Sequence, residues 1–109
     1  MVKKYIPKQG DLVFLDLNPT KGHDRPAIVV SNNVFNENTK MVIVCPVTSN
    51  NKEFPTHYQL EDTQQIHGSV LCEHIRSIDY EIRNLKFIEK LSENDLMSII
   101  TLLNACIEE

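Results

Sequence analysis

The chain has 109 residues, 41% of them hydrophobic and 24% charged, and its formal net charge is −4. This length and composition exclude a disordered or low-complexity chain and allow one domain with one hydrophobic core, which we place over residues 1–109. The negative charge excludes a uniformly basic surface for nucleic acid.

The acidic excess lies in the last third of the chain. From residue 79 onward there are seven acidic residues and three basic ones, whereas residues 1–78 hold eight of each. A local basic site for an anionic partner is therefore compatible with the first two thirds of the chain.

The first residues and the cysteines bear on the compartment. The start, MVKKYIPKQG, lacks the apolar region of a signal peptide, and no apolar run approaches the roughly 18 residues that cross a bilayer. Cys45, Cys72 and Cys106 are odd in number, far apart and set among apolar neighbours, as reduced core thiols usually are. We expect a cytoplasmic protein with no membrane partner and no disulfide framework.

The first half of the chain predicts three strands. Residues 11–17 form the first, and the breakers of NPTKG follow it. Residues 26–31 and 41–47 are continuous apolar runs, which are typical of strands buried on both faces. We expect a loop or one helical turn over residues 32–40, and Pro46 as the end of the third strand or a bulge in it.

The second half predicts three more strands, over residues 56–60, 68–72 and 86–90, and a helix over about residues 93–107. Ser92 begins the helix, because SEND places an acid three residues after a serine, as in a capping box. The expected fold class is mainly β with a C-terminal helix, either a small β-barrel or a strongly bent sheet. Five apolar residues at helical spacing predict a core or interface face: Leu96, Ile99, Ile100, Leu103 and Ile107.

Arg25 immediately precedes Pro26 at the start of the second predicted strand. Proline restricts the preceding residue to extended geometry, so the backbone of Arg25 is held in one state. A guanidinium held in this way suits a phosphate, which it can bind with two parallel hydrogen bonds. The position also fits a surface arginine paired with Asp24 or Asp16, and most arginines serve no site.

Thr48 and Ser49 follow the third predicted strand in CPVTSN. Functional groups often lie where a rigid strand gives way to a loop, and both hydroxyls can hydrogen-bond a phosphate. A threonine, serine and asparagine at a strand end are also ordinary turn residues.

Glu73 and His74 follow the fifth predicted strand and form a candidate acid–base pair, because histidine titrates near neutrality. The alternative is a solvated strand end in which Glu73 pairs with Arg76. A metal site from His67, Cys72 and His74 is discarded, because their spacing matches no recognised zinc motif.

The chain contains five blocks in order from Gly10 to about Ile107: GDLVFLDLNPTKG, RPAIVVS, VIVCPVTS, GSVLCEHIRSID and an amphipathic helix. Together they resemble the MazF/PemK/Kid family of toxin endoribonucleases, the mRNA interferases of type II toxin–antitoxin systems. The resemblance implies an SH3-like barrel of the CcdB/MazF type that forms a homodimer, with single-stranded RNA in a groove across the interface. It also implies cleavage at short motifs without a metal or other cofactor, which inhibits translation and growth. A cognate antitoxin would block the groove with a flexible acidic tail.

The resemblance assigns roles to residues of this chain. Arg25 matches the family's catalytic arginine and Thr48 its partner threonine, both acting on the phosphate. The implied reaction is attack of the ribose 2′-OH on phosphorus, leaving 2′,3′-cyclic phosphate and 5′-OH ends. Arginine is a poor general base, so the base stays open. Glu73 matches an acid that some members use as a base, but Leu71 stands where those members have an arginine.

The loop between the first two strands is shorter than in many relatives, because only His23 and Asp24 separate the TKG and RP blocks. Contacts of that loop with RNA or antitoxin are therefore not transferred. We expect these further side chains to contact RNA: Lys21, Ser31, Ser49, Lys52 and Arg76.

Two alternative functions stand beside the nuclease. A CcdB-like gyrase-poisoning toxin would have the same fold, but the resemblance implies that such proteins act through an aromatic-containing C-terminal tripeptide. This chain has no tryptophan and ends Ile107-Glu-Glu109. A catalytically inactive barrel that only binds RNA or protein is the second alternative, because a correct residue set does not guarantee correct geometry.

Overall fold

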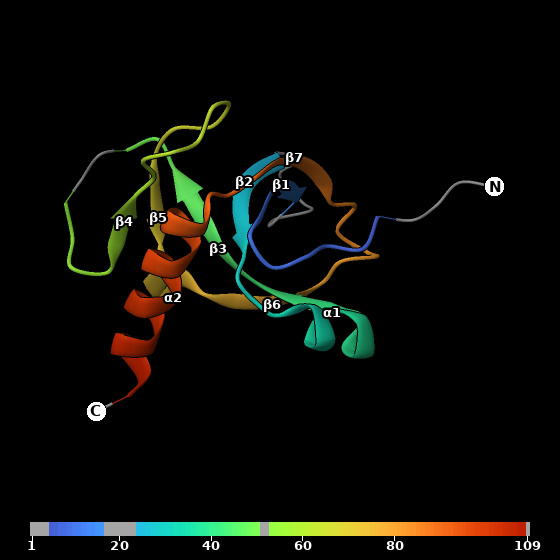
Figure 1. The fold of residues 1–109 in the computed structure, drawn as a ribbon. Coiled ribbons are helices and arrows are strands. Elements are labelled where there is room, and N and C mark those ends of the chain that lie inside the picture. The colour runs from blue at the N-terminus through green and yellow to red at the C-terminus, as the bar shows by residue number, and fades with distance from the viewer. Residues whose placement is uncertain (1–4, 17–23, 51–52, 109) are drawn as a thin grey trace.

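The chain folds into a strongly bent antiparallel sheet on which two helices pack (Figure 1). A computed structural model describes residues 5–16, 24–50 and 53–108, with the backbone alone at residues 16 and 24. No helix in these ranges is long and apolar enough to span a membrane. The strands are β1 (Asp11–Asp16), β2 (Asp24–Val29), β3 (Met41–Thr48), β4 (His57–Gln59), β5 (Ser69–Leu71), β6 (Arg76–Asp79) and β7 (Lys86–Lys90). The helices are α1 (Asn33–Thr39), the 3-10 turn η1 (Cys72–His74) and α2 (Glu93–Ile107).

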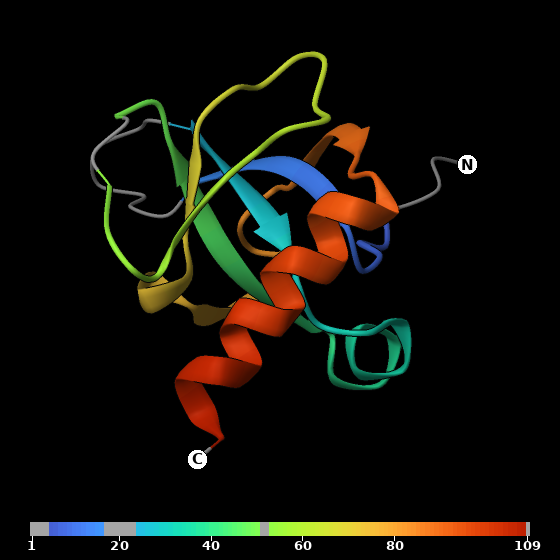
Figure 2. The ribbon, with the colours of Figure 1, turned by 60° about the vertical axis from the view of Figure 1, so that its left-hand side comes forward.

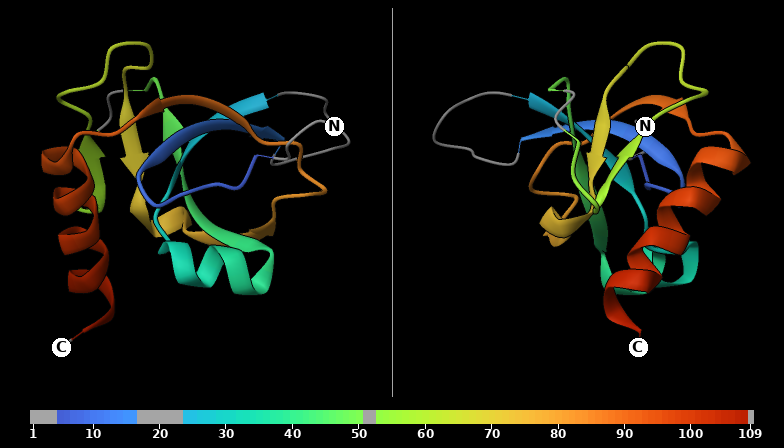
Figure 3. Two further views of the ribbon diagram at one scale, coloured as in Figure 1. Left: turned by 45° about the vertical axis from the view of Figure 1, so that its right-hand side comes forward. Right: turned by 90° about the vertical axis from the view of Figure 1, so that its left-hand side faces the viewer.

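The described strands pair in the order β4-β5-β3-β2-β1-β7, and β6 also pairs with β3. Strand β3 is long enough to hold β2 along one edge, with β6 and then β5 along the other. This change of partner accompanies the bend visible in Figure 3, so the sheet curves like a barrel although β4 and β7 remain its ends. The expected class, mainly β with a C-terminal helix, is confirmed.

Both faces of the central strands are buried, as their continuous apolar runs predicted. On one face, Leu12 and Ile28 pack with Ile99 of α2, and Figure 2 shows α2 crossing this face diagonally. On the other face, Val13 and Ala27 belong to a second core closed by β6. Because successive strand residues point to opposite faces, a run with two buried faces contains few polar residues.

Pro46 does not end or bulge the third strand, contrary to expectation, because β3 continues through it. Backbone groups of successive strand residues point to opposite edges, and the Ile43 carbonyl accepts from Val30 on the β2 edge. The nitrogen of Pro46 therefore faces the other edge, where pairing with β6 ends at Val44 and pairing with β5 begins at Val47. The missing N–H falls between two partners, so no ladder hydrogen bond is lost.

Two elements differ from the sequence prediction. The segment expected as a loop or single turn forms α1, whose N-cap Asn32 accepts from Phe35 N–H and whose C-cap Lys40 has a φ of 58°. The sequence predicted no strand in the segment after η1, but this segment forms β6, which pairs with β3. It is short and only Ile78 in it is buried, so its alternation was too weak to predict a strand.

Helix α2 has the predicted bounds, and the Ser92 hydroxyl accepts from Asp95 N–H at 3.0 Å. Ile99 and Leu103 are buried, whereas Ile107 is 74% exposed, so the predicted apolar face enters the core only over its middle turns. The carboxylate of Asp95 is fully buried and accepts from the Tyr58 hydroxyl at 2.6 Å. It therefore connects α2 to β4.

The three cysteines are free, but they are less separate than their spacing indicated. Cys45 and Cys72 are buried in the core, and their thiols hydrogen-bond to each other. That hydrogen bond, followed by burial, raises the pKa of Cys45. Cys106 is exposed on α2, so the expectation of a core thiol was wrong for it.

Candidate active site

A hollow of about 360 Å³ lies where the start of β2, the end of β3 and the loop before β5 meet. A guanidinium, two hydroxyls, an amide and an imidazole line it together with three apolar side chains. This set can bind a phosphate and exchange a proton. The lining residues are Arg25, Pro26, Val47, Thr48, Ser49, Gln65, Ile66 and His67.

Antiparallel pairing brings Arg25 and Thr48 together. The register of β2 and β3 sets Ala27 opposite Pro46, and the same register extended by two residues sets Arg25 opposite Thr48. Residues two apart on a strand share a face, so both side chains stand on one side of the pair. Arg25 is exposed and Thr48 is half-buried, which leaves both polar groups open to a ligand in the hollow.

Gly68 packs directly against the backbone of Thr48. Its φ is +153°, and a Cβ built on it would lie 2.2 Å from the Thr48 carbonyl oxygen. Only glycine permits this approach, because any side chain would overlap the strand. The next residue, Ser69, pairs with Thr48 in the register of β3 and β5. The position of Thr48 is therefore set by β5 as well as by β2.

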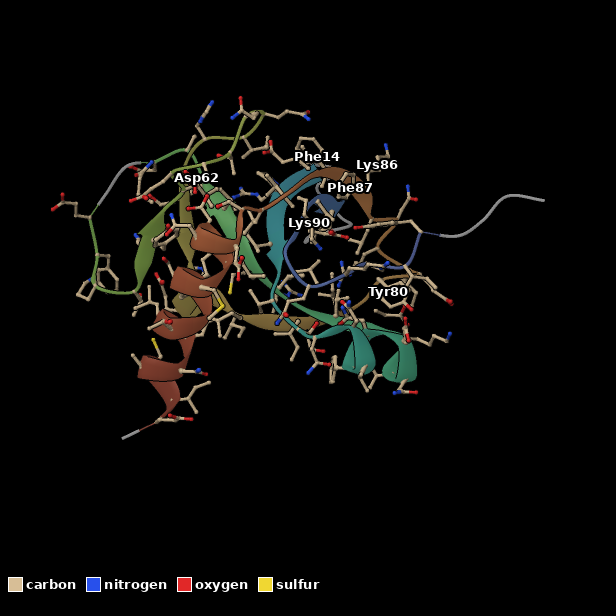
Figure 4. All side chains as sticks on the ribbon, in the orientation of Figure 1. Phe14, Asp62, Tyr80, Lys86, Phe87 and Lys90 are labelled. Atoms are coloured by element: carbon tan, nitrogen blue, oxygen red, sulfur yellow. The ribbon has the colours of Figure 1, made fainter. Side chains whose placement is uncertain are left out.

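The beginning of the loop between β4 and β5 is held by helix α2. The Asp95 carboxylate accepts from the backbone N–H groups of Glu61 at 3.2 Å and Asp62 at 3.0 Å. Asp62, labelled in Figure 4 beside the first turn of α2, accepts from the Ser92 hydroxyl at 2.7 Å. Burial, followed by the hydrogen bond to Asp95, raises the pKa of Tyr58 to about 12. These contacts fix where the loop leaves β4.

The end of the same loop is held by β7 and β4. The Glu89 carboxylate accepts from the backbone N–H groups of Gln64 at 2.9 Å and Gln65 at 2.6 Å. Leu60 N–H donates to the Gly68 carbonyl at 2.9 Å. Because both sides are tied in this way, residues 65–67 form a defined wall of the hollow.

Glu73 and His74 lie in η1 and do not line the hollow. The Glu73 carboxylate accepts from the Thr56 hydroxyl at 2.7 Å and pairs with His57 Nε2 at 2.7 Å. His57, and not Arg76, is therefore its partner. Burial raises the pKa of Glu73, but the hydrogen bonds from Thr56, its own backbone and His57 outweigh this effect and lower it. His74 Nε2 is 4.0 Å from the same carboxylate and its side chain is 61% exposed.

The side chains that the sequence predicted to contact RNA do not all line the hollow. Ser49 lines the hollow. Ser31 is buried and its hydroxyl donates to Asn36 and accepts from Ile43 N–H, so it supports the fold and does not face a ligand. Arg76 is exposed on β6, outside the hollow. Lys21 and Lys52 lie outside the described residues, as do the side chains of residues 16 and 24, the alternative partners of Arg25.

Gln65 and His67 line the hollow but were not predicted as site residues with Arg25. No motif marks them, and His67 was considered only as a metal ligand. The following glycine is the one local signal, because an isolated glycine at a strand often marks a close backbone approach. Across the described ranges, no group of three histidine, cysteine or acidic side chains is arranged to hold a metal ion.

Comparison with known proteins supplies a family. A family model described as PemK-like, MazF-like toxin of type II toxin–antitoxin system matches residues 8–107. The chain is 32% identical to a protein of Escherichia coli named endoribonuclease toxin MazF, over 98% of this chain and 99% of that protein. It is 31% identical to endoribonuclease EndoA of Bacillus subtilis, over 68% of this chain and 72% of that protein.

Solved structures agree with the sequence comparison. MazF from Deinococcus radiodurans superposes with a TM-score of 0.86 at 31% identity, covering 97% of this chain and 100% of that one. A MazE–MazF structure from the same organism gives a TM-score of 0.86 at 30% identity, covering 96% of this chain and 98% of that one. The similarity therefore extends over nearly the whole fold.

Proposed function

The chain belongs to the PemK-like, MazF-like toxin family of type II toxin–antitoxin systems, and from that premise we propose that it cuts RNA in the hollow shared by Arg25 and Thr48. It is an endoribonuclease toxin of this family. One observation carries the assignment of the site: a guanidinium and a hydroxyl from neighbouring strands line the same hollow.

The proposed reaction is an internal transesterification of single-stranded RNA. The ribose 2′-oxygen bonds to the adjacent phosphorus and loses its proton, and the bond from phosphorus to the 5′-oxygen breaks. The products carry a 2′,3′-cyclic phosphate and a 5′-OH, and no electrons are transferred to or from the protein. Because RNA brings its own nucleophile, the protein has only to position it, move protons and stabilise charge.

Arg25 and Thr48 supply the stabilisation. The Arg25 guanidinium binds the non-bridging oxygens, whose negative charge increases as the phosphorane forms. The Thr48 hydroxyl donates a hydrogen bond to the same phosphate, and Ser49 is a further donor beside it. Thr48 is preorganised for this role because Gly68 and Ser69 hold its backbone. No metal or other cofactor enters these steps.

The partners follow from the family. The structures of relatives with their antitoxins support a cognate antitoxin for this toxin, which would compete with RNA for the site. We place the active form as a homodimer in the cytoplasm, where single-stranded mRNA is available, and expect cleavage at short sequence motifs. The curated relatives reported above are named endoribonucleases, which favours a nuclease over a gyrase-poisoning toxin or an inactive barrel.

The test uses long, mostly unpaired RNA in excess EDTA, with the wild type, Arg25→Ala and Thr48→Val. Removal of one donor to a charged transition state costs about 10²–10³-fold in rate, so Arg25→Ala should lose at least that much while remaining folded and dimeric. Lys86→Ala, a change of an exposed cation on β7 (Figure 4), is the matched control and should cleave normally.

Mapping of the cut sites and ends completes the test. Cuts at one short motif with cyclic-phosphate and 5′-OH ends are expected. Equal cleavage by the wild type and Arg25→Ala would remove Arg25 from the reaction, and loss of cleavage in EDTA would overturn metal independence.

A further inference from the structure

We infer that His67 is the general base of this site and accepts the proton of the ribose 2′-OH. The inference rests on the proposed RNA cleavage and identifies a group that the sequence left open. His67 comes from the loop before β5 and lines the same hollow as Arg25 and Thr48.

The chemistry of the lining limits which described residues can act as a base. A general base near neutral pH needs a side chain that can accept and hold a proton there. Among the described lining residues, the hydroxyls, the amide and the apolar side chains cannot do so, and a guanidinium stays protonated below about pH 12. Histidine is the residue type that titrates near neutrality, and His67 is the one histidine that the described part of the chain contributes to this lining.

The carboxylate of Glu73, which could compete for the role, lies elsewhere in the fold. Glu73 is already paired with Thr56 and His57 at 2.7 Å each and does not line the hollow. His74 shares that location in η1. The candidate acid–base pair of the sequence is therefore separate from Arg25, whereas His67 lines the same hollow.

The loop that carries His67 is held in place on both sides of this residue. Glu89 holds the two backbone N–H groups of Gln64 and Gln65, and the Thr63 hydroxyl donates to the Ile66 carbonyl. Gly68, which directly follows His67, packs against the carbonyl of Thr48. Because the residues on both sides of His67 are anchored, its side chain keeps a constant position relative to the groups that bind the phosphate. Proton transfer requires such a fixed position.

Charged groups of β2 and β7 lie on the hollow and on the part of the loop that carries His67. Arg25 of β2 lines the same hollow, and the Glu89 carboxylate of β7 accepts from the loop backbone at Gln64 and Gln65. In the reaction the neutral imidazole takes the 2′-proton as the oxygen bonds to phosphorus. The 5′-oxygen leaves with the electron pair of its broken bond and takes a proton from water, and the imidazolium later returns its proton to solvent.

The experiment measures single-turnover cleavage from about pH 5 to 9 by the wild type, His67→Gln and His67→Asn. General base catalysis contributes about 10²–10⁴-fold, so both variants should lose at least about 10²-fold at neutral pH. The wild-type rate should rise with pH within this range, because only the neutral imidazole can accept the proton, and the variants should lose this rise. Gln64→Ala, on the same loop with its side chain outside the hollow, is the matched control and should keep the wild-type profile.

An RNA with sulfur in place of the scissile 5′-oxygen separates a base from an acid. A thiolate leaves without a proton, so this substrate would restore the rate of His67→Gln if His67 protonated the leaving group. We expect no restoration, and full restoration would overturn the assignment.

Three further outcomes decide the inference. Normal cleavage by folded His67→Gln would overturn it while leaving the proposed function intact. Loss of the pH dependence in His74→Gln with retention in His67→Gln would transfer the role to η1. Absence of RNA cleavage by the wild type would refute the proposed function and this inference with it.

Discussion

Gly68→Ala is predicted to displace Thr48 and to lower both stability and cleavage rate. The added Cβ would lie 2.2 Å from the Thr48 carbonyl oxygen and 3.0 Å from its carbon. An ordinary contact between carbon and oxygen is about 3.3 Å or longer, so β3 or β5 must move by about 1 Å. Misplacement of a substrate-binding group by about 1 Å can reduce catalysis by about 10²-fold.

The expected loss of stability has two sources. Alanine at a φ of +153° pays a backbone strain of about 1–3 kcal/mol. Displacement of a packed strand adds an overpacking cost of about 1–3 kcal/mol. Together they remove a large part of the roughly 5–15 kcal/mol by which domains are stable. We expect the midpoint of thermal unfolding to fall by at least about 8 °C.

Gly10→Ala is the matched control for this prediction. Gly10 has a φ of +89°, but its added Cβ would meet side-chain atoms of Leu96 and Lys90 at 3.2 Å or more. Gly10→Ala should therefore lose stability through backbone strain and keep the wild-type rate. Far-UV circular dichroism against temperature gives the stability, and cleavage is compared where both variants are folded. A Gly68→Ala variant with the full rate there would refute the control of Thr48 by Gly68.

Three other features of the fold yield predictions. Asp95→Ala should cost about 3 kcal/mol or more in urea unfolding, because it removes the acceptor of three donors and each orphaned donor costs about 1–3 kcal/mol; an unchanged midpoint would contradict the anchoring of the loop by α2. The pKa of Glu73 is lowered from 4.5 in the folded chain, so its contribution is present above about pH 4.5 and is lost as the pH falls through the folded value. Glu73→Gln should accordingly flatten the decline of thermal stability below pH 4.5, and identical slopes would count against the pairing. A disulfide reagent should modify Cys106 in the native protein, and Cys45 and Cys72 only after unfolding; three equally fast reactions would show that the buried pair is open.

Much of the fold could be predicted because burial determines how apolar residues are spaced along each strand and helix. The strands β2 and β3 were predicted from continuous apolar runs, and both of their faces are buried. Helix α2 was predicted with its bounds because Ser92 provides the cap. Pro46 was misjudged because its effect depends on which edge of β3 its nitrogen faces, and that depends on the partners of β3.

The candidate site, like the fold, has one part that lies on strands predicted from local sequence and one part that is positioned by contacts between residues distant in sequence. Arg25 and Thr48 lie on strands with clear local patterns, and a regular antiparallel register is enough to bring them together. The wall that carries His67 has no such pattern, because Asp95 and Glu89, both distant in sequence, hold its loop in place. A side chain on a loop acquires a precise position only through such distant anchors. The group proposed to move the proton is therefore the one that local sequence could not identify, whereas Arg25 and Thr48 were assigned to the phosphate by the resemblance to a known family.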